Sequence, residues 1–291
     1  MYRTPPGKNS GAVQNSGIVQ AIDDAQANDS VQANGQIASF SPSKNIRILL
    51  CNPNATKSMT DNCLKMVQPT LPPDVEVIGF TAPPPAPTAI EGSFDNIMSS
   101  AASMRAILPL QQENDYDAFL VACYSDHGLI KMLREEFDKP VIGIMEASLF
   151  AARTLGARFG IVATSKRSSV MHRDSVRHYG MDGFCAGIKS CNLGVLDLER
   201  KPRAEVLDIM QSVAKDLVAD GAEVLTLGCA GMADMKAAVE EAVGEAVQVI
   251  DGAVAGVHHL VGMVRLGGKT AKCGMYASSS KGRKLRGQEY V

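Results

Sequence analysis

Two sets of four apolar segments, each rich in β-branched residues, alternate along this chain with segments of helical periodicity. Alternation of this kind predicts parallel sheets that are covered by helices. The first set comprises IRILLCNP (46–53), VEVIGF (75–80), AFLVAC (118–123) and PVIGI (140–144). The second set comprises RFGIVATS (158–165), a weaker stretch near GFCAGIK (183–189), EVLTLGC (223–229) and VQVID (247–251). We therefore expect an α/β protein in which one pattern of strands occurs twice.

The spacing of the repeat indicates two similar halves, because the interval between Cys123 and Cys229 nearly equals the interval between the opening segments of the two sets. Right-handed crossovers would wind each set into a small sheet. The expected fold is α/β, with two pseudo-symmetric doubly wound domains, four-stranded mainly parallel sheets, and the active site in the cleft between them. A helical segment at 146–156 would lead into the second half, and another at 252–266 would return to the first.

The resulting domain division assigns 45–148 plus 253–291 to domain I and 149–252 to domain II. The first 44 residues are rich in Gln, Asn, Ser, Gly and Asp and show no sustained apolar period, which predicts a disordered extension at 1–44.

Charge and cysteine content exclude several classes of function. The chain has 29 basic and 31 acidic side chains and a formal net charge of −2, so we expect no nucleic-acid or membrane partner. A small-molecule substrate fits this balance better, and association into a homo-oligomer is left open. The seven cysteines are odd in number and follow no secretory signal, which indicates a reducing, cytoplasmic location.

Cys123 and Cys229 end two apolar runs, YDAFLVAC and AEVLTLGC, that read as buried parallel strands. Open α/β sheets bind ligands at the carboxyl ends of their strands. Two thiols in equivalent positions therefore suggest a pair of acid/base groups that face one pocket from opposite sides. A free thiol has a pKa of about 8.5, and a modest shift gives a usable thiolate at neutral pH.

Longer motifs around these cysteines carry a family resemblance. They are IRILLCNPNATKSMT, PTAIEG, DAFLVACYSDHGL, PVIGIMEAS and AEVLTLGCAGM, which together span most of the chain between residues 46 and 255. With these motifs the chain resembles the aspartate/glutamate racemase superfamily, in its hydantoin racemase branch. The resemblance implies an isomerase that inverts a carbon next to a carbonyl without cofactor or metal. It also implies that one of Cys123 and Cys229 removes the proton as a thiolate while the other returns one as a thiol.

Candidate substrate-binding residues lie in the turns that follow the strands, where amides and hydroxyls could stabilise a developing enolate oxygen. They are Asn54, Tyr124, Ser125, His127, Thr164, Ser165, Ala230 and Gly231. For Asn54, Thr164 and Ser165 a purely structural role in a turn or helix cap is an equal alternative. Glu91 is expected to cap the helix that follows it.

His127 departs from the bacterial hydantoin racemase pattern, in which Pro commonly follows the Asp of this block. An imidazole four residues from the thiol could lower the pKa of Cys123 or contact substrate. It could equally cap a helix at the rim of the pocket. The sequence leaves both readings open.

The absence of an Arg cluster near the motifs favours a neutral ring, such as a hydantoin, allantoin or a cyclic dipeptide, over an acidic amino acid. Two alternatives remain: a decarboxylase or isomerase of the same superfamily, and a non-catalytic ligand-binding or regulatory module. A zinc site built from Cys185, Cys191 and a histidine is disfavoured, because the two cysteines lack the close spacing of zinc knuckles.

Overall fold

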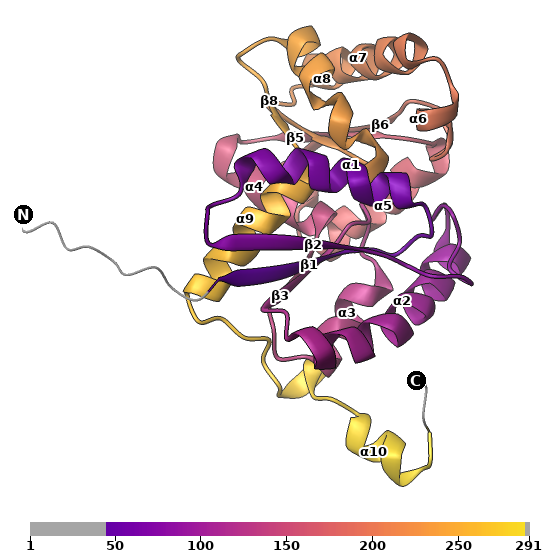
Figure 1. Cartoon of the computed structure of the whole chain (residues 1–291). Coiled ribbons are helices and arrows are strands. Elements are labelled where there is room, and N and C mark those ends of the chain that lie inside the picture. Colours follow the sequence, from indigo (N-terminus) through magenta and orange to yellow (C-terminus); the bar gives the residue numbers. More distant parts are fainter. Residues whose placement is uncertain (1–44, 289–291) are drawn as a thin grey trace, which may run out of the picture. The chain divides into compact units, whose positions relative to one another are not determined.

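The computed structural model describes residues 45–288, so the extension predicted at 1–44 lies outside the described residues. Within that range the chain forms two four-stranded sheets in which all strand pairs are parallel (Figure 1). The first sheet has the order β2-β1-β3-β4 and contains β1 (Ile46–Asn52), β2 (Val75–Thr81), β3 (Ala118–Val121) and β4 (Val141–Gly143). The second has the order β6-β5-β7-β8 and contains β5 (Phe159–Ala163), β6 (Cys185–Ser190), β7 (Val224–Leu227) and β8 (Gln248–Ile250).

The predicted repeat is confirmed, because both sheets place their second, first, third and fourth strands in the same order. Each of the eight apolar segments contributes a strand, including the weaker one near GFCAGIK. That segment forms β6 at an edge of the second sheet, and its side chains are mostly half-buried. The inner strands β3, β5 and β7 are buried along their whole length, which explains their largely apolar sequences.

Helices and short 3-10 turns connect the strands. Those of the first half are α1 (Lys57–Val67), η1 (Gln68–Thr70), α2 (Ser93–Asn114), α3 (Gly128–Glu136) and α4 (Ile144–Leu155). Those that follow are α5 (Lys166–His178), η2 (Asp182–Phe184), α6 (Asp197–Arg200), α7 (Arg203–Ala219), η3 (Ala230–Met235), α8 (Lys236–Val243), α9 (Gly252–Arg265), η4 (Gly274–Tyr276) and α10 (Ser280–Leu285). Among the described helices, none has the combined length and apolar character of a membrane span.

Helices α4 and α9 pack side by side and link the two sheets. α4 contacts β7 and β8, whereas α9 returns to contact β1, β3 and β4, as the sequence predicts. Gly256 permits this return, because a Cβ at that position would lie 2.4 Å from Cδ1 of Leu120 on β3. Both sheets belong to one compact unit of the described residues. The finer boundaries of the two predicted domains stay predictions.

Candidate active site

The two turns that carry Cys123 and Cys229 follow the third strand of each sheet. Cys123 comes two residues after the end of β3, and Cys229 comes two residues after the end of β7. Gly228 lets the second turn lie close to β5, because a Cβ there would meet the carbonyl oxygen of Val162 at 2.7 Å. The amide of Gly228 donates a hydrogen bond to that same oxygen. Equivalent topology thus places both thiols beyond the carboxyl edges of their sheets.

Cys123 has a half-buried side chain whose sulfur lies 3.3 Å from Oγ of Ser125. Burial raises the pKa of the Cys123 thiol to about 12. The hydrogen bond with Ser125 lowers this pKa, while the charge of a Cys229 thiolate raises it. The interaction between the two sulfurs favours a state in which only one of them is ionised.

Cys229 begins the turn η3, and its Sγ accepts a hydrogen bond from the backbone amide of Gly231 at 3.4 Å. Burial raises the pKa of the Cys229 thiol to about 11, and the Gly231 amide lowers it. The carboxylates of Glu199 and Glu91 add a smaller increase to this pKa. The donors, a hydroxyl beside Cys123 and a backbone N–H beside Cys229, only partly offset the effect of burial, so neither thiol has the lowered pKa that the sequence led us to expect.

A cavity of about 50 Å³ lies beside Cys123. It is bounded by the turn after β3, by the turn after β5 and by one face of α5. The lining residues are Ile90, Glu91, Asn96, Cys123, Tyr124, Ser125, Thr164, Ser165, Ser168, Met171, His172 and Val195. Five of the residues predicted from sequence are brought together here: Cys123, Tyr124, Ser125, Thr164 and Ser165. Thr164 and Ser165 also have the structural role that the sequence left open, since Ser165 caps α5 in a capping box with Ser168.

Tyr124 connects the Cys123 turn with the strand that leads to Cys229. Its hydroxyl lies 2.5 Å from Oγ1 of Thr226 on β7 and accepts from Ser148 of α4 at 3.4 Å. All three side chains are buried. A polar contact between the two halves is thus placed one residue from Cys123 and three residues from Cys229.

Cys229, Asn54, Ala230 and Gly231 do not line this cavity, so the cavity brings only one of the two predicted thiols to its wall. The amide oxygen of Asn54 accepts from the backbone amide of Thr56 and from Nδ2 of Asn52, so its side chain stabilises the turn before α1. Ala230 is buried, and the backbone amide of Gly231 donates its hydrogen bond to the sulfur of Cys229.

His127 is the N-cap of α3 and is fully buried. Its Nδ1 accepts from the amide of Leu129 at 3.2 Å, and its Nε2 lies 3.1 Å from Oγ of Ser99. Burial lowers the pKa of His127 to about 4, so the imidazole is neutral at pH 7. His127 does not line the cavity beside Cys123. These contacts favour the helix-cap reading over a substrate contact.

Glu91 does not cap α2, which contradicts the sequence-based expectation. The N-cap is Gly92, and the carboxylate of Glu91 instead accepts from the amide of Val195 in the second half at 3.2 Å. Glu91 also lines the cavity, and its charge raises the pKa of Cys229, which is not itself a lining residue.

The sequence reasoning missed His172 as a cavity residue. His172 is buried on α5, and its Nε2 lies 3.2 Å from the carbonyl oxygen of Gly228, the residue before Cys229. The available signal was helical spacing: Ser168, Met171 and His172 share one face of α5, and all three line the cavity.

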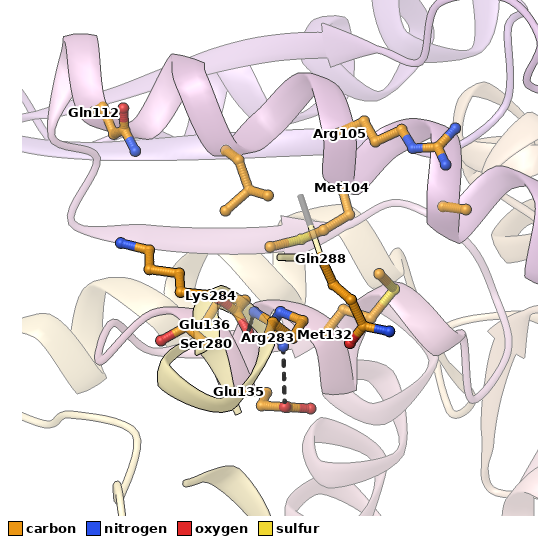
Figure 2. Close-up of a pocket in the computed structure, with 12 residues that line it drawn as sticks. Met104, Arg105, Gln112, Met132, Glu135, Glu136, Ser280, Arg283, Lys284 and Gln288 are labelled. Carbon is orange, nitrogen blue, oxygen red and sulfur yellow. Dashed lines mark hydrogen bonds and ion pairs between the residues drawn. The ribbon is translucent and has the colours of Figure 1, made fainter. Parts of the chain in front are cut away.

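A larger cavity of about 670 Å³ lies elsewhere, between α2, α3 and the C-terminal α10 (Figure 2). Met104 of α2 and Met132 of α3 form part of its apolar wall, while Arg283 of α10 pairs with Glu135 of α3 at 3.8 Å. It contains none of the residues predicted for the site. Within residues 45–288, no three His, Cys, Asp or Glu side chains are grouped so that they could hold a metal ion.

Comparison with known proteins gives consistent results. The family model described as Asp/Glu/Hydantoin racemase matches residues 48–260. A hydantoin racemase from Pseudomonas sp. is 36% identical over 246 residues, which cover 84% of this chain and 94% of that protein. The allantoin racemase of Pseudomonas fluorescens has a TM-score of 0.74 at 29% identity and covers 80% of this chain and 97% of its own. The allantoin racemase of Klebsiella pneumoniae has a TM-score of 0.73, also at 29% identity, and covers 80% of this chain and 93% of its own.

The fold and the relatives together define the class of this protein: it is an isomerase, more narrowly a racemase. Its α/β fold contains two sheets that repeat one strand order. The chain belongs to the Asp/Glu/hydantoin racemase family.

Proposed function

We propose that this racemase inverts a carbon next to a carbonyl in a hydantoin-like cyclic amide, with Cys123 and Cys229 as the two acid/base groups and without a cofactor. The observation that carries the proposal is the placement of the two thiols at equivalent positions, each two residues after the third strand of its sheet. The names of the relatives support the substrate class, since the chain matches hydantoin racemases along nearly their full length.

The proton balance of the reaction needs only the two thiols. One thiolate takes the proton from carbon, so an S–H bond forms, the C–H bond breaks, and the electron pair moves into the adjacent carbonyl as an enolate. The other thiol then gives its proton to the opposite face of the carbon and becomes the thiolate. The Ser125 hydroxyl stabilises the thiolate of Cys123, and the Gly231 amide stabilises the thiolate of Cys229.

The polar lining of the cavity supports a neutral substrate. Its described polar residues include Asn96, Thr164, Ser165 and Ser168, and no Lys or Arg is among them. Glu91 contributes a carboxylate, which would repel a second one. An acidic amino acid would therefore lack a countercharge within this set, whereas a ring with amide groups would find hydrogen-bond partners.

The test is proton exchange during inversion. The protein is incubated in heavy water with an enantiopure 5-monosubstituted hydantoin or with allantoin, and optical rotation and deuterium content are followed together. We expect inversion with deuterium uptake at the stereocentre, and loss of inversion of at least about a thousandfold in Cys123→Ala and in Cys229→Ala, because each thiol acts as acid or base in every turnover. Cys273→Ala, at an exposed cysteine, is the matched control. Full turnover in both single variants would contradict the two-thiol mechanism.

We also propose a reducing, cytoplasmic location for the enzyme. All seven cysteines lie within the described residues, and each of them is a free thiol.

A further inference from the structure

His172 has one ring nitrogen with a partner and one without. Nε2 lies 3.2 Å from the carbonyl oxygen of Gly228, and a carbonyl can only accept, so Nε2 carries the proton. Nδ1 of a neutral imidazole then holds a lone pair and is a hydrogen-bond acceptor. Within the described residues, this buried Nδ1 has no hydrogen-bond partner.

An unsatisfied buried acceptor is rare in folded proteins and calls for an explanation. Here the side chain that carries it is 4% exposed and lines the same cavity as Cys123. A ligand in that cavity would supply the missing donor. The partner of Nε2 adds a link to the second thiol, because Gly228 directly precedes Cys229.

The orientation of the ring is fixed on two sides. The Tyr124 ring packs against it edge-on, with the ring centres 5.2 Å apart and the planes at 74°. Tyr124 is itself held by Thr226 and Ser148. Burial lowers the pKa of His172 to about 4, so the ring stays neutral across the physiological range. The acceptor is therefore preorganised before any ligand binds.

We propose that Nδ1 of His172 accepts a hydrogen bond from a ring N–H of the substrate and thereby selects cyclic amides and ureides over carboxylates. This inference rests on the proposed function, since it assigns the cavity beside Cys123 to the substrate. A hydantoin or allantoin ring brings N–H groups next to its carbonyls. A carboxylate is acceptor-only, so it would set a lone pair against the lone pair of Nδ1. Binding of a carboxylate would therefore be unfavourable for two reasons: the repulsion from the lone pair of Nδ1 and the repulsion from the carboxylate of Glu91.

Binding of a ligand that cannot react separates this contact from catalysis. In 5,5-dimethylhydantoin the ring carbon C5 carries two methyl groups and no proton, so proton abstraction at this carbon is impossible. Two analogues each lack one N–H: 2,2-dimethylsuccinimide replaces the N–H beside the quaternary carbon by CH₂, and 3,5,5-trimethylhydantoin carries a methyl on the imide nitrogen. Calorimetry on the wild-type chain should show binding of the parent ring and binding at least about tenfold weaker for one analogue.

The His172→Phe variant keeps a ring against Tyr124 but has no acceptor. We expect it to bind 5,5-dimethylhydantoin about tenfold more weakly than wild type and to bind the parent ring and the discriminated analogue with equal affinity. His258→Phe makes the same change at an exposed position on α9 and should leave all affinities unchanged. A thermal melt of each variant confirms folding.

The wild-type measurements keep the proposal testable even when His172→Phe does not fold. Equal binding of all three rings by the wild type would overturn it, as would failure to bind any of them. An N–H penalty of the same size in wild type and in His172→Phe would show that another group accepts the bond, and would also overturn it. A different outcome would separate the two proposals. If the unreactive rings bind with the expected dependence on His172, but 5-monosubstituted hydantoins and allantoin show no deuterium exchange, the two-thiol mechanism is refuted and the His172 contact still holds.

Discussion

At the scale of single residues, Cys123 and Cys229 show why a thiol suits this chemistry and what limits it. Burial stabilises the neutral form of each sulfur, and each has only one donor that opposes this effect. The sequence predicted the positions of both thiols from the strands before them. It could not predict their pKa values, because those depend on how deeply each sulfur is buried and on groups such as the Glu199 carboxylate that lie far from Cys229 in the sequence.

The pH dependence of turnover follows from these pKa values. With the pKa of Cys229 raised to about 11 and that of Cys123 to about 12, the unliganded site is mostly doubly protonated at neutral pH. Because one thiolate is required, kcat/KM should rise about tenfold per pH unit from pH 7 to pH 10. Steady-state kinetics with both enantiomers measure this, and a plateau below pH 9 would contradict it.

Ser125→Ala should lower kcat/KM at pH 8, because it removes the hydroxyl that lowers the pKa of Cys123.

His127 and His172 illustrate what residue types alone leave open. The sequence singled out His127, which the structure places as a buried helix cap, and passed over His172, which lines the cavity. Both are buried histidines on or before a helix, so residue type does not separate them. The distinction depends on which helix face meets the cavity, and that is set by tertiary packing.

At the scale of elements, the repeated set of strands was predictable because most of the strands have a strong local signal, with the segment of β6 the weaker exception. The turns between them were less predictable. Glu91 shows the reason: its partner, the Val195 amide, lies in the other half of the chain, and local capping rules contain no information about such a partner.

The link between the Cys123 turn and β7 gives a prediction at this scale. Tyr124→Phe and Thr226→Val each remove one side of a buried 2.5 Å contact that fixes the spacing between the two thiol-bearing turns. Each variant should lose about 1 kcal/mol in free energy of unfolding. Each should also lower kcat more than it changes KM, since a loosened spacing impairs proton transfer rather than ground-state binding.

A double-mutant cycle isolates this link. The Tyr124→Phe/Thr226→Val double variant should lose less stability than the two single losses combined, with a coupling of about 1 kcal/mol. Tyr276→Phe, at a half-buried tyrosine of η4 outside the cavity, should leave kcat unchanged. Strict additivity of the two changes would show that the contact does not act as a link.

At the scale of the whole molecule, the buried histidines connect stability to pH. Burial depresses the pKa values of His127 and His172 from 6.5 to about 4. Such groups contribute stability that is fully present above the unfolded pKa of 6.5 and is lost as the pH falls towards 4, because the unfolded chain then binds more protons. The free energy of unfolding should therefore decrease by a few kcal/mol, on the order of 3 kcal/mol per histidine at most, over this window.

Urea titrations between pH 7 and pH 4 measure this loss. His127→Asn retains a good N-cap residue but removes one titrating group, so its stability should fall less steeply with acid. His258→Asn, at an exposed histidine, should follow the wild-type slope. A wild-type stability that does not change between pH 6.5 and pH 4 would show that these imidazoles titrate alike in the folded and unfolded chain.

The unequal surroundings of the two sulfurs, a hydroxyl on one side and a backbone amide on the other, have a thermodynamic consequence. For a substrate with a single stereocentre, the two mirror-image forms have equal free energy in water, so the equilibrium constant between them is one. The Haldane relation then requires equal kcat/KM in the two directions, however different the two thiols are. Their differences can appear only in the separate values of kcat and KM, which must change by the same factor from one enantiomer to the other.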